Sequence, residues 1–223
     1  MRLKLLSLLV LGAGLIHAAS DAADRLTAAA KAFTEVMDIP DKAVPQDLLN
    51  KAQCIVIVPG LKKGAFIFGA QYGKGFFSCR PMSGVGWSAP GGVIVEGGSF
   101  GVQIGGSQTD VFMLVMNPRG EDRLLSSKFT IGGDATAAAG PVGRSTQGQT
   151  DGAFTAEILT WSRSKGLFAG ISLTGATLRQ DAAWNKELYG RDINNREIIT
   201  GDTAPPAAAA ELMDGLNKFS SRK

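Results

Sequence analysis

Residues 54–80 read CIVIVPGLKKGAFIFGAQYGKGFFSCR, and this stretch decides the class of fold. It contains short apolar runs rich in β-branched and aromatic residues, separated by Gly, Pro and Lys. Runs of this kind between turn-forming residues predict consecutive strands of an antiparallel sheet. In this interpretation Pro59-Gly60 and Gly73-Lys74-Gly75 form turns. The predicted strands are residues 54–58, 65–72 and 76–80.

Similar runs continue through the centre of the chain. The 29 glycines among the 223 residues lie between them without a collagen-like period. This distribution suits the many tight turns of a β-rich protein. Further strands are therefore predicted at residues 92–96, 100–104, 111–116, 154–161 and 170–178.

Helical periodicity flanks this region on both sides. Apolar residues recur at helical spacing within Ser20–Met37, and Asp21 and Asp24 favour the N-terminal end of that helix. Pro45 is suited to begin a second, short helix. Later helices are predicted at residues 119–127, 181–189 and 207–219.

Together these elements predict one α+β domain that is mainly β. Its curved antiparallel sheet could close into a barrel, and helices flank it at the N-terminal and C-terminal ends. The length is sufficient for the core of a single domain. The predicted organisation is a helical lead-in over residues 20–52, a β-rich core over 53–180 and C-terminal helices over 181–223.

Residues 1–19 have the pattern of a cleaved export signal. A short basic start precedes an apolar run over residues 5–16, and small residues follow at Ala18 and Ala19. The run is shorter than the ~20 residues that a membrane-spanning helix needs. We therefore expect a periplasmic or secreted protein, and the style of the signal indicates a bacterium.

The charge balance argues against a nucleic-acid partner. The chain has 23 Lys and Arg against 20 Asp and Glu, and Arg2 and Lys4 belong to the predicted signal. The domain itself is therefore close to neutral, whereas a nucleic-acid-binding domain is markedly basic. A basic partner site would have to be a local patch.

The sequence offers no catalytic or metal-binding constellation. Its one histidine, His17, lies within the predicted signal, so the commonest general base and transition-metal ligand is missing from the domain. Ser162-Arg163-Ser164-Lys165 matches the S-x-x-K pattern of serine β-lactamases, but it follows a β-like run and no K-T-G or S-D-N motif accompanies it. We expect no enzyme, no cofactor and no metal.

Cys54 and Cys79 are the only cysteines, and export would permit a disulfide between them. A simple three-strand meander would place them on its first and third strands, ~9.6 Å apart, which exceeds the ~7 Å Cα limit for a bridge. Either the meander is wrong or the thiols are free. We favour the disulfide.

Beyond these local patterns, an ordered set of segments resembles the SYLF family, which occurs in bacterial exported proteins and in eukaryotic proteins of membrane traffic and actin patches. The set covers most of residues 50–190 and is specific as a whole, although no single piece is diagnostic. The matching segments are AQCIVIVPGLKKG (52–64), GAQYGKGFFSCR (69–80), GWSAP (86–90), GGSFGVQIGGSQTD (97–110), LVMN (114–117), KFTIGGDATAAAGPVGR (128–144) and WSRSKGLFAGISLTGA (161–176), followed by Tyr189-Gly190.

This resemblance implies lipid binding, with phosphoinositides as the ligands best associated with eukaryotic members, some of which also bind actin filaments. In some members an N-terminal amphipathic segment assists lipid binding. The predicted helix at Ser20–Met37 matches that segment only in position, and its polar face carries just Arg25 and Lys31.

Basic residues within the matching segments form the predicted lipid site. Lys62 and Lys63 are placed at the first turn, Lys74 at the opposite turn, and Arg80 at a strand end. Each surface cation could contribute ~1 kcal/mol to binding anionic headgroups. The complete set of candidates is Lys62, Lys63, Lys74, Arg80, Arg144, Arg163 and Lys165.

The predicted function is therefore non-enzymatic binding of anionic or phosphoinositide-like lipid in the bacterial envelope. The first alternative is a structural or protein-interaction module, with actin binding as the family analogy. A hydrolase that uses carboxylates or Ser-Lys chemistry is the second alternative.

Overall fold

The computed structural model describes residues 21–39, 44–65, 69–99, 105–142 and 155–222. The predicted signal, the predicted strand at 100–104 and Arg144 lie outside these residues. Within the described part, no helix combines the length and the apolar character needed to cross a bilayer.

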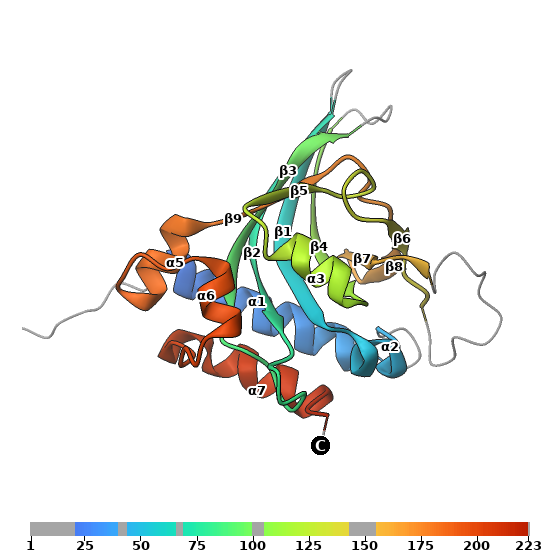
Figure 1. The fold of residues 1–223 in the computed structure, drawn as a ribbon. Helices are drawn as coiled ribbons and strands as arrows, with labels where there is room; N and C mark the ends of the chain where they lie inside the picture. Colours follow the sequence, from blue (N-terminus) through green and yellow to red (C-terminus); the bar gives the residue numbers. More distant parts are fainter. Residues whose placement is uncertain (1–20, 40–43, 66–68, 100–104, 143–154, 223) are drawn as a thin grey trace, which may run out of the picture.

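A strongly curled mixed sheet forms the centre of the domain (Figure 1). Its strand order is β5-β9-β3-β2-β1-β4-β7-β6, and β8 also pairs with β7. Every pairing is antiparallel except that of β6 with β7. The strands are β1 (Cys54–Ala65), β2 (Gly69–Cys79), β3 (Gly91–Ser99), β4 (Gly105–Val115), β5 (Lys128–Thr130), β6 (Ala137–Ala139), β7 (Ile158–Ser164), β8 (Leu167–Gly170) and β9 (Thr177–Gln180).

Helices from both ends of the chain lie together beside this sheet, while the far ends of β1 to β4 extend beyond them (Figure 1). The predicted α+β class, the curved sheet and the terminal helices are thus confirmed, and the sheet forms a half-barrel. The helices are α1 (Asp21–Met37), α2 (Gln46–Lys51), α3 (Pro118–Leu124), α5 (Ala182–Tyr189), α6 (Asn195–Thr200) and α7 (Ala210–Phe219), with a short 3-10 helix, η1 (Ala207–Ala209).

The predicted three-strand meander is wrong, because residues 54–79 form two long strands. Pro59-Gly60 does not end β1 but forms a β-bulge inside it, where the register shifts between Ile57 and Lys62. Gly60 has φ +63, a left-handed conformation that glycine adopts without strain. Proline is tolerated in a central strand at a bulge.

Gly73 and Gly75, predicted to form a turn, lie inside β2 opposite this bulge. A Cβ at Gly75 would lie 2.1 Å from the Ile57 carbonyl oxygen and 2.7 Å from the Val58 Cα. A Cβ at Gly73 would meet the Val58 side chain at 2.8 Å. These glycines therefore allow the two backbones to approach closely, and they do not reverse the chain.

The two cysteines lie directly opposite each other on β1 and β2 and form a disulfide, with their Cα atoms 3.9 Å apart. The predicted disulfide is therefore present. The estimate of ~9.6 Å between the cysteines was wrong because it assumed a third strand between them, whereas β1 and β2 are adjacent. The neighbouring residues Gln53 and Arg80 are joined by a hydrogen bond from Arg80 N to Gln53 O. Hydrogen-bonded and non-hydrogen-bonded pairs alternate along an antiparallel ladder, so Cys54 and Cys79 form a non-hydrogen-bonded pair, in which the Cα atoms are closer together.

Strand alternation divides the interior into two cores. On β1, Ile55 and Ile57 face α1, whereas Val56 and Val58 face the opposite side of the sheet. The helix-side core contains Leu26, Phe33, Phe76, Phe112, Trp161 and Leu216, and the opposite core contains Phe77, Met113, Phe129, Leu178 and Ile198.

The remaining predicted elements agree in part. The predicted strand at 170–178 is mostly wrong, because residues 171–176 connect β8 to β9 and only its two ends lie in those strands. Short elements β5, β6 and α6 have no predicted counterpart. α6 begins with a capping box in which Asn194 and Glu197 bond each other's backbone. That pattern is visible in the sequence, but an apolar run too short to show periodicity follows it.

Candidate functional site

Helix α1 supplies one wall of the candidate site. Asp21 and Asp24 stabilise its first turn, and Leu26, Phe33 and Val36 form a stripe buried in the helix-side core. The flank beside this stripe carries Arg25, Ala28, Lys31, Ala32 and Glu35, which face the bulged part of the sheet.

The β1 bulge supplies the opposite wall. Its distortion turns the Gly60 amide outward, where it donates a 2.9 Å hydrogen bond to Asp110 Oδ1 on β4. The Pro59 carbonyl accepts a 2.8 Å hydrogen bond from Arg25 Nη1 of α1. A Cβ at Gly60 would meet Gln108 Nε2 at 2.4 Å, so the Gln108 amide lies directly over the bulge.

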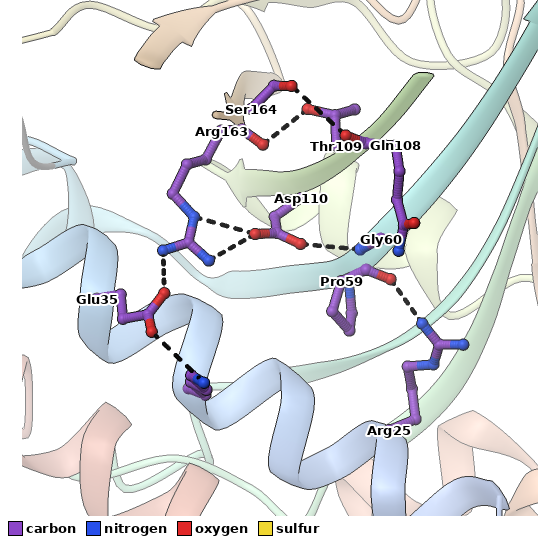
Figure 2. Close-up of polar contacts among 10 residues, drawn as sticks. Arg25, Glu35, Pro59, Gly60, Gln108, Thr109, Asp110, Arg163 and Ser164 are labelled. Atoms are coloured by element: carbon purple, nitrogen blue, oxygen red, sulfur yellow. Dashed lines mark hydrogen bonds and ion pairs between the residues drawn. The ribbon is translucent and has the colours of Figure 1, made fainter. Parts of the chain in front are cut away.

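Arg163 of β7 joins these walls (Figure 2). Its Nε and Nη2 atoms donate to Asp110 Oδ2 at 3.0 and 2.6 Å, and Nη1 donates to Glu35 Oε2 of α1. Lys31 Nζ lies 3.9 Å from the other Glu35 oxygen. One guanidinium therefore ties α1 to two neighbouring strands.

The electrostatics follow from these contacts. The hydrogen bond from Arg163 lowers the pKa of Glu35 more than desolvation raises it. Burial alone would lower the pKa of Arg163, but its bonds to Glu35 and Asp110 outweigh burial and raise the pKa. Glu35 and Arg163 are therefore both charged at neutral pH.

Between the walls is a hollow of about 350 Å³, which we call the α1 pocket. Small apolar groups of Ala28, Ala32 and Pro59 line it together with polar side chains. Its charged lining is three cations, Arg25, Lys31 and Arg163, against the two carboxylates of Glu35 and Asp110, a surplus of one positive charge.

The two carboxylates are committed mainly to Arg163. Arg25 has a backbone carbonyl as its hydrogen-bond partner and forms no ion pair among the described residues. Lys31 is 73% exposed and reaches Glu35 only at the limit of an ion pair. Arg25 and Lys31 therefore keep donors that an anion entering the pocket could use.

Of the predicted lipid-site residues that the structure describes, Arg163 lines the α1 pocket and the other five do not. Lys62 and Lys63 are not at a turn but within β1. Lys62 is exposed opposite Tyr72 and Gln108, on the same side of the sheet as α1. Lys63 is partly buried, and that burial lowers its pKa.

Lys74 and Lys165 also differ in setting. Lys74 lies inside β2, where its Nζ is 2.6 Å from Asp181 Oδ2 and 4.2 Å from the centre of the Trp184 ring. Lys165 is exposed in the turn between β7 and β8, with φ 47.

Arg80 is buried, and its guanidinium forms hydrogen bonds within the domain. Its guanidinium donates to Gly86 O, Leu49 O, Ser220 O and Ser220 Oγ, and it lies 3.5 Å from the centre of the Trp87 ring. No carboxylate partners it among the described residues. Desolvation, with the nearby charge of Arg222, lowers its pKa to about 10, so it stays charged at neutral pH.

One group of potential metal ligands forms in the described part of the chain, namely Cys54, Cys79 and Glu121. Because the two sulfur atoms are bonded to each other, this group offers no thiolate to a metal.

The sequence is similar to a known protein family and to several eukaryotic proteins. Residues 96–219 match the family described as Ysc84: Las17-binding protein actin regulator. Human SH3 domain-containing YSC84-like protein 1 is 33% identical over 193 residues, which are 85% of this chain and 56% of the human protein. LAS seventeen-binding protein 3 of Saccharomyces cerevisiae is 32% identical over 176 residues, 77% of this chain and 38% of the yeast protein.

An SH3 domain-containing protein of Schizosaccharomyces pombe is 36% identical over 180 residues, which are 79% of this chain and 41% of that protein. The chain thus spans about half the length, or less, of these relatives. The family match covers more than half of the chain, and the sequence resemblance noted above extends over the same sheet. This chain belongs to the Ysc84 (SYLF) family.

Proposed function

We propose that the chain is a non-enzymatic lipid-binding domain that holds an anionic headgroup in the α1 pocket. The observation that carries this proposal is the composition of that pocket, where a small apolar lining lies among cations that outnumber the carboxylates. An anionic lipid has matching parts, because its headgroup is charged and the adjoining glycerol and acyl carbons are apolar.

Neighbouring cations extend the attraction beyond the pocket. Lys62 is exposed opposite Gln108, a lining residue of the pocket. Ser164 Oγ lies 3.5 Å from the Gln108 carbonyl oxygen, and Lys165 is the next residue along the chain. The proposed lipid-binding residues are therefore Arg25, Lys31 and Arg163, with Lys62 and Lys165 at the margin.

Charge reversal of Arg25 and Lys31 should weaken binding to anionic vesicles. Each cation near an anionic surface contributes ~1 kcal/mol, so R25E/K31E should reduce the affinity by about tenfold or more. Co-sedimentation with vesicles of phosphatidylglycerol and phosphatidylcholine, and with phosphatidylcholine alone, measures this. Binding should also weaken as salt rises from about 0.1 to 0.5 M, since the Debye length is already only ~10 Å at 0.1 M.

The matched control is Arg123→Glu, which reverses an exposed cation of α3 outside the α1 pocket. It should bind vesicles like the unaltered protein, and circular dichroism should show that every variant is folded. Equal binding to neutral and anionic vesicles would contradict the proposal and point to apolar insertion. No binding to either would favour the second candidate.

The second candidate function is binding of another protein. It is supported by the family description, a Las17-binding actin regulator, and by the name of the yeast relative. The yeast relative is longer than this chain, as are two other relatives that are named for an SH3 domain.

We also propose that the protein acts in the bacterial periplasm or is secreted. The basic and apolar pattern of residues 1–19 supports export, and a disulfide such as Cys54–Cys79 persists in oxidising compartments. Protein isolated from its native source should therefore begin near Ala19 or Ser20 and carry no free thiol. Intact-mass analysis after thiol labelling in denaturant tests both features. A retained Met1 or two labelled cysteines would contradict this localisation.

A further inference from the structure

The connection between β2 and β3 presents two apolar side chains to solvent. We call residues 81–86 the Met82 loop. Met82 is fully exposed and Val85 is 56% exposed, on a segment of only six residues. A single exposed apolar side chain is ordinary, but two on one short loop are a candidate contact surface.

The base of this loop is firmly anchored. Arg80, just before it, donates to the Gly86 carbonyl at 2.9 Å and to the Ser220 carbonyl at 2.7 Å. The Gly86 amide donates to the Ser221 carbonyl at 2.7 Å, and Trp87 Nε1 donates to Ser220 O at 2.7 Å. Within the loop, the Gly84 amide bonds to the Pro81 carbonyl at 2.8 Å. A loop held in this way loses little conformational freedom when it binds.

Three cations without ion pairs flank the chain segments that hold this loop in place. Arg222 follows Ser221 and donates from Nη2 to the Ala52 carbonyl at 2.6 Å, beside Lys51. Lys218, one turn earlier, lies 4.7 Å from the centre of the Phe219 ring. None of Lys51, Lys218 and Arg222 pairs with a carboxylate of the described residues. We call these three residues the basic collar.

The Met82 loop and the α1 pocket lie on different flanks of α1. The loop is attached to the end of α7, and α7 contacts α1 through the rings of Phe219 and Phe33, 5.8 Å apart, and near Thr34. The pocket is lined by Ala28, Ala32 and Glu35, which point to the other side of the same helix. A flat bilayer against the pocket would therefore not also cover the loop.

We propose that the Met82 loop and the basic collar are a docking surface for a segment of another protein that carries apolar side chains among carboxylates. Two apolar side chains are few for holding a bilayer, which takes several combined signals. They are sufficient as the centre of a small protein contact, and Met adapts its shape to its partner. The cations of the basic collar, which have no ion pairs of their own, would attract carboxylates of the partner that lie around this apolar contact. This inference rests on the second candidate function and locates its surface.

The test uses two synthetic helical peptides with the same leucine spacing, one with Glu and one with Lys at the polar positions. The Glu peptide should shift the backbone amide signals of residues 82–86 and 217–222 of the 15N-labelled protein, and the Lys peptide should not. M82S/V85S should weaken Glu-peptide binding by about tenfold or more. K218E should weaken it as well.

Leu167→Ser is the matched control, because it removes another apolar side chain that is 73% exposed but lies at the β7–β8 turn. It should leave peptide binding unchanged. The inference is overturned if the Glu peptide leaves the loop signals unmoved, or if both peptides bind equally. It is also overturned if M82S/V85S loses binding to phosphatidylglycerol vesicles, which would make the loop a lipid contact. Loss of vesicle binding in R25E/K31E bears on the α1 pocket alone, so the two proposals fail separately.

Discussion

Replacing Gly75 by alanine should destabilise the domain by more than about 3 kcal/mol, the upper end of the usual cost of overpacking a core. The added Cβ would lie 2.1 Å from the Ile57 carbonyl oxygen and 2.7 Å from the Val58 Cα. Because both are backbone atoms of a paired strand, no rotamer change can relieve the overlap. Single domains are stable by only ~5–15 kcal/mol, so G75A should lose a large share of the stability of the domain. Urea denaturation measures the loss.

Gly64→Ala is the control within the same hairpin. No atom lies within 4 Å of a Cβ built at Gly64, so this variant should stay within about 1 kcal/mol of the unaltered protein. If G75A and G64A proved equally stable, the close approach of β1 and β2 at the bulge would not be a requirement of the fold.

Replacing Arg80 by methionine should cost about 3–5 kcal/mol. The loss leaves the carbonyl oxygens of Leu49 and Gly86 without this donor, while the Ser220 carbonyl keeps only its bond from Trp87 Nε1, and each unsatisfied buried group costs ~1–3 kcal/mol. It also removes the cation from the face of Trp87. Thermal and urea unfolding followed by tryptophan fluorescence should show the loss.

Two further variants separate charge from geometry. Lys cannot reproduce the forked donors of a guanidinium, so R80K should recover little of the stability. Lys218→Met removes an exposed cation nearby and should change stability by less than about 0.5 kcal/mol. Full stability of R80K would show that a positive charge alone suffices at this position.

The helices other than α6 were predictable from sequence because their signals are local. The apolar spacing and first-turn acids of α1 lie within one segment, and α5 ends at Gly190, which has φ +68. The glycines inside β1 and β2 were predicted to form turns, but they lie within paired strands, and no local sequence signal distinguishes these two roles. Gly75 is required by Ile57 and Val58 on the neighbouring strand, so its role is visible only when the pairing is known.

The candidate site was predictable only in part for the same reason. Arg163 was a candidate, but its partners Glu35 and Asp110 lie 128 and 53 residues away. Arg25 and Lys31 were recognised only as the polar face of a helix, because nothing in the sequence shows which strand they face. Arg80 looked like an exposed strand end, since the Ser220 that binds it is 140 residues distant.

The packing of α1 against α7 also sets the order in which the domain can be completed. Phe33, near the start of the domain, requires Phe219, and Arg80 requires Ser220. While residues 210–222 are still being synthesised, the sheet can pair, but the helix-side core lacks Leu212, Met213 and Leu216 of α7, and Arg80 has no acceptors at position 220. A nascent chain therefore cannot complete that side of the domain until α7 and the residues after it have emerged.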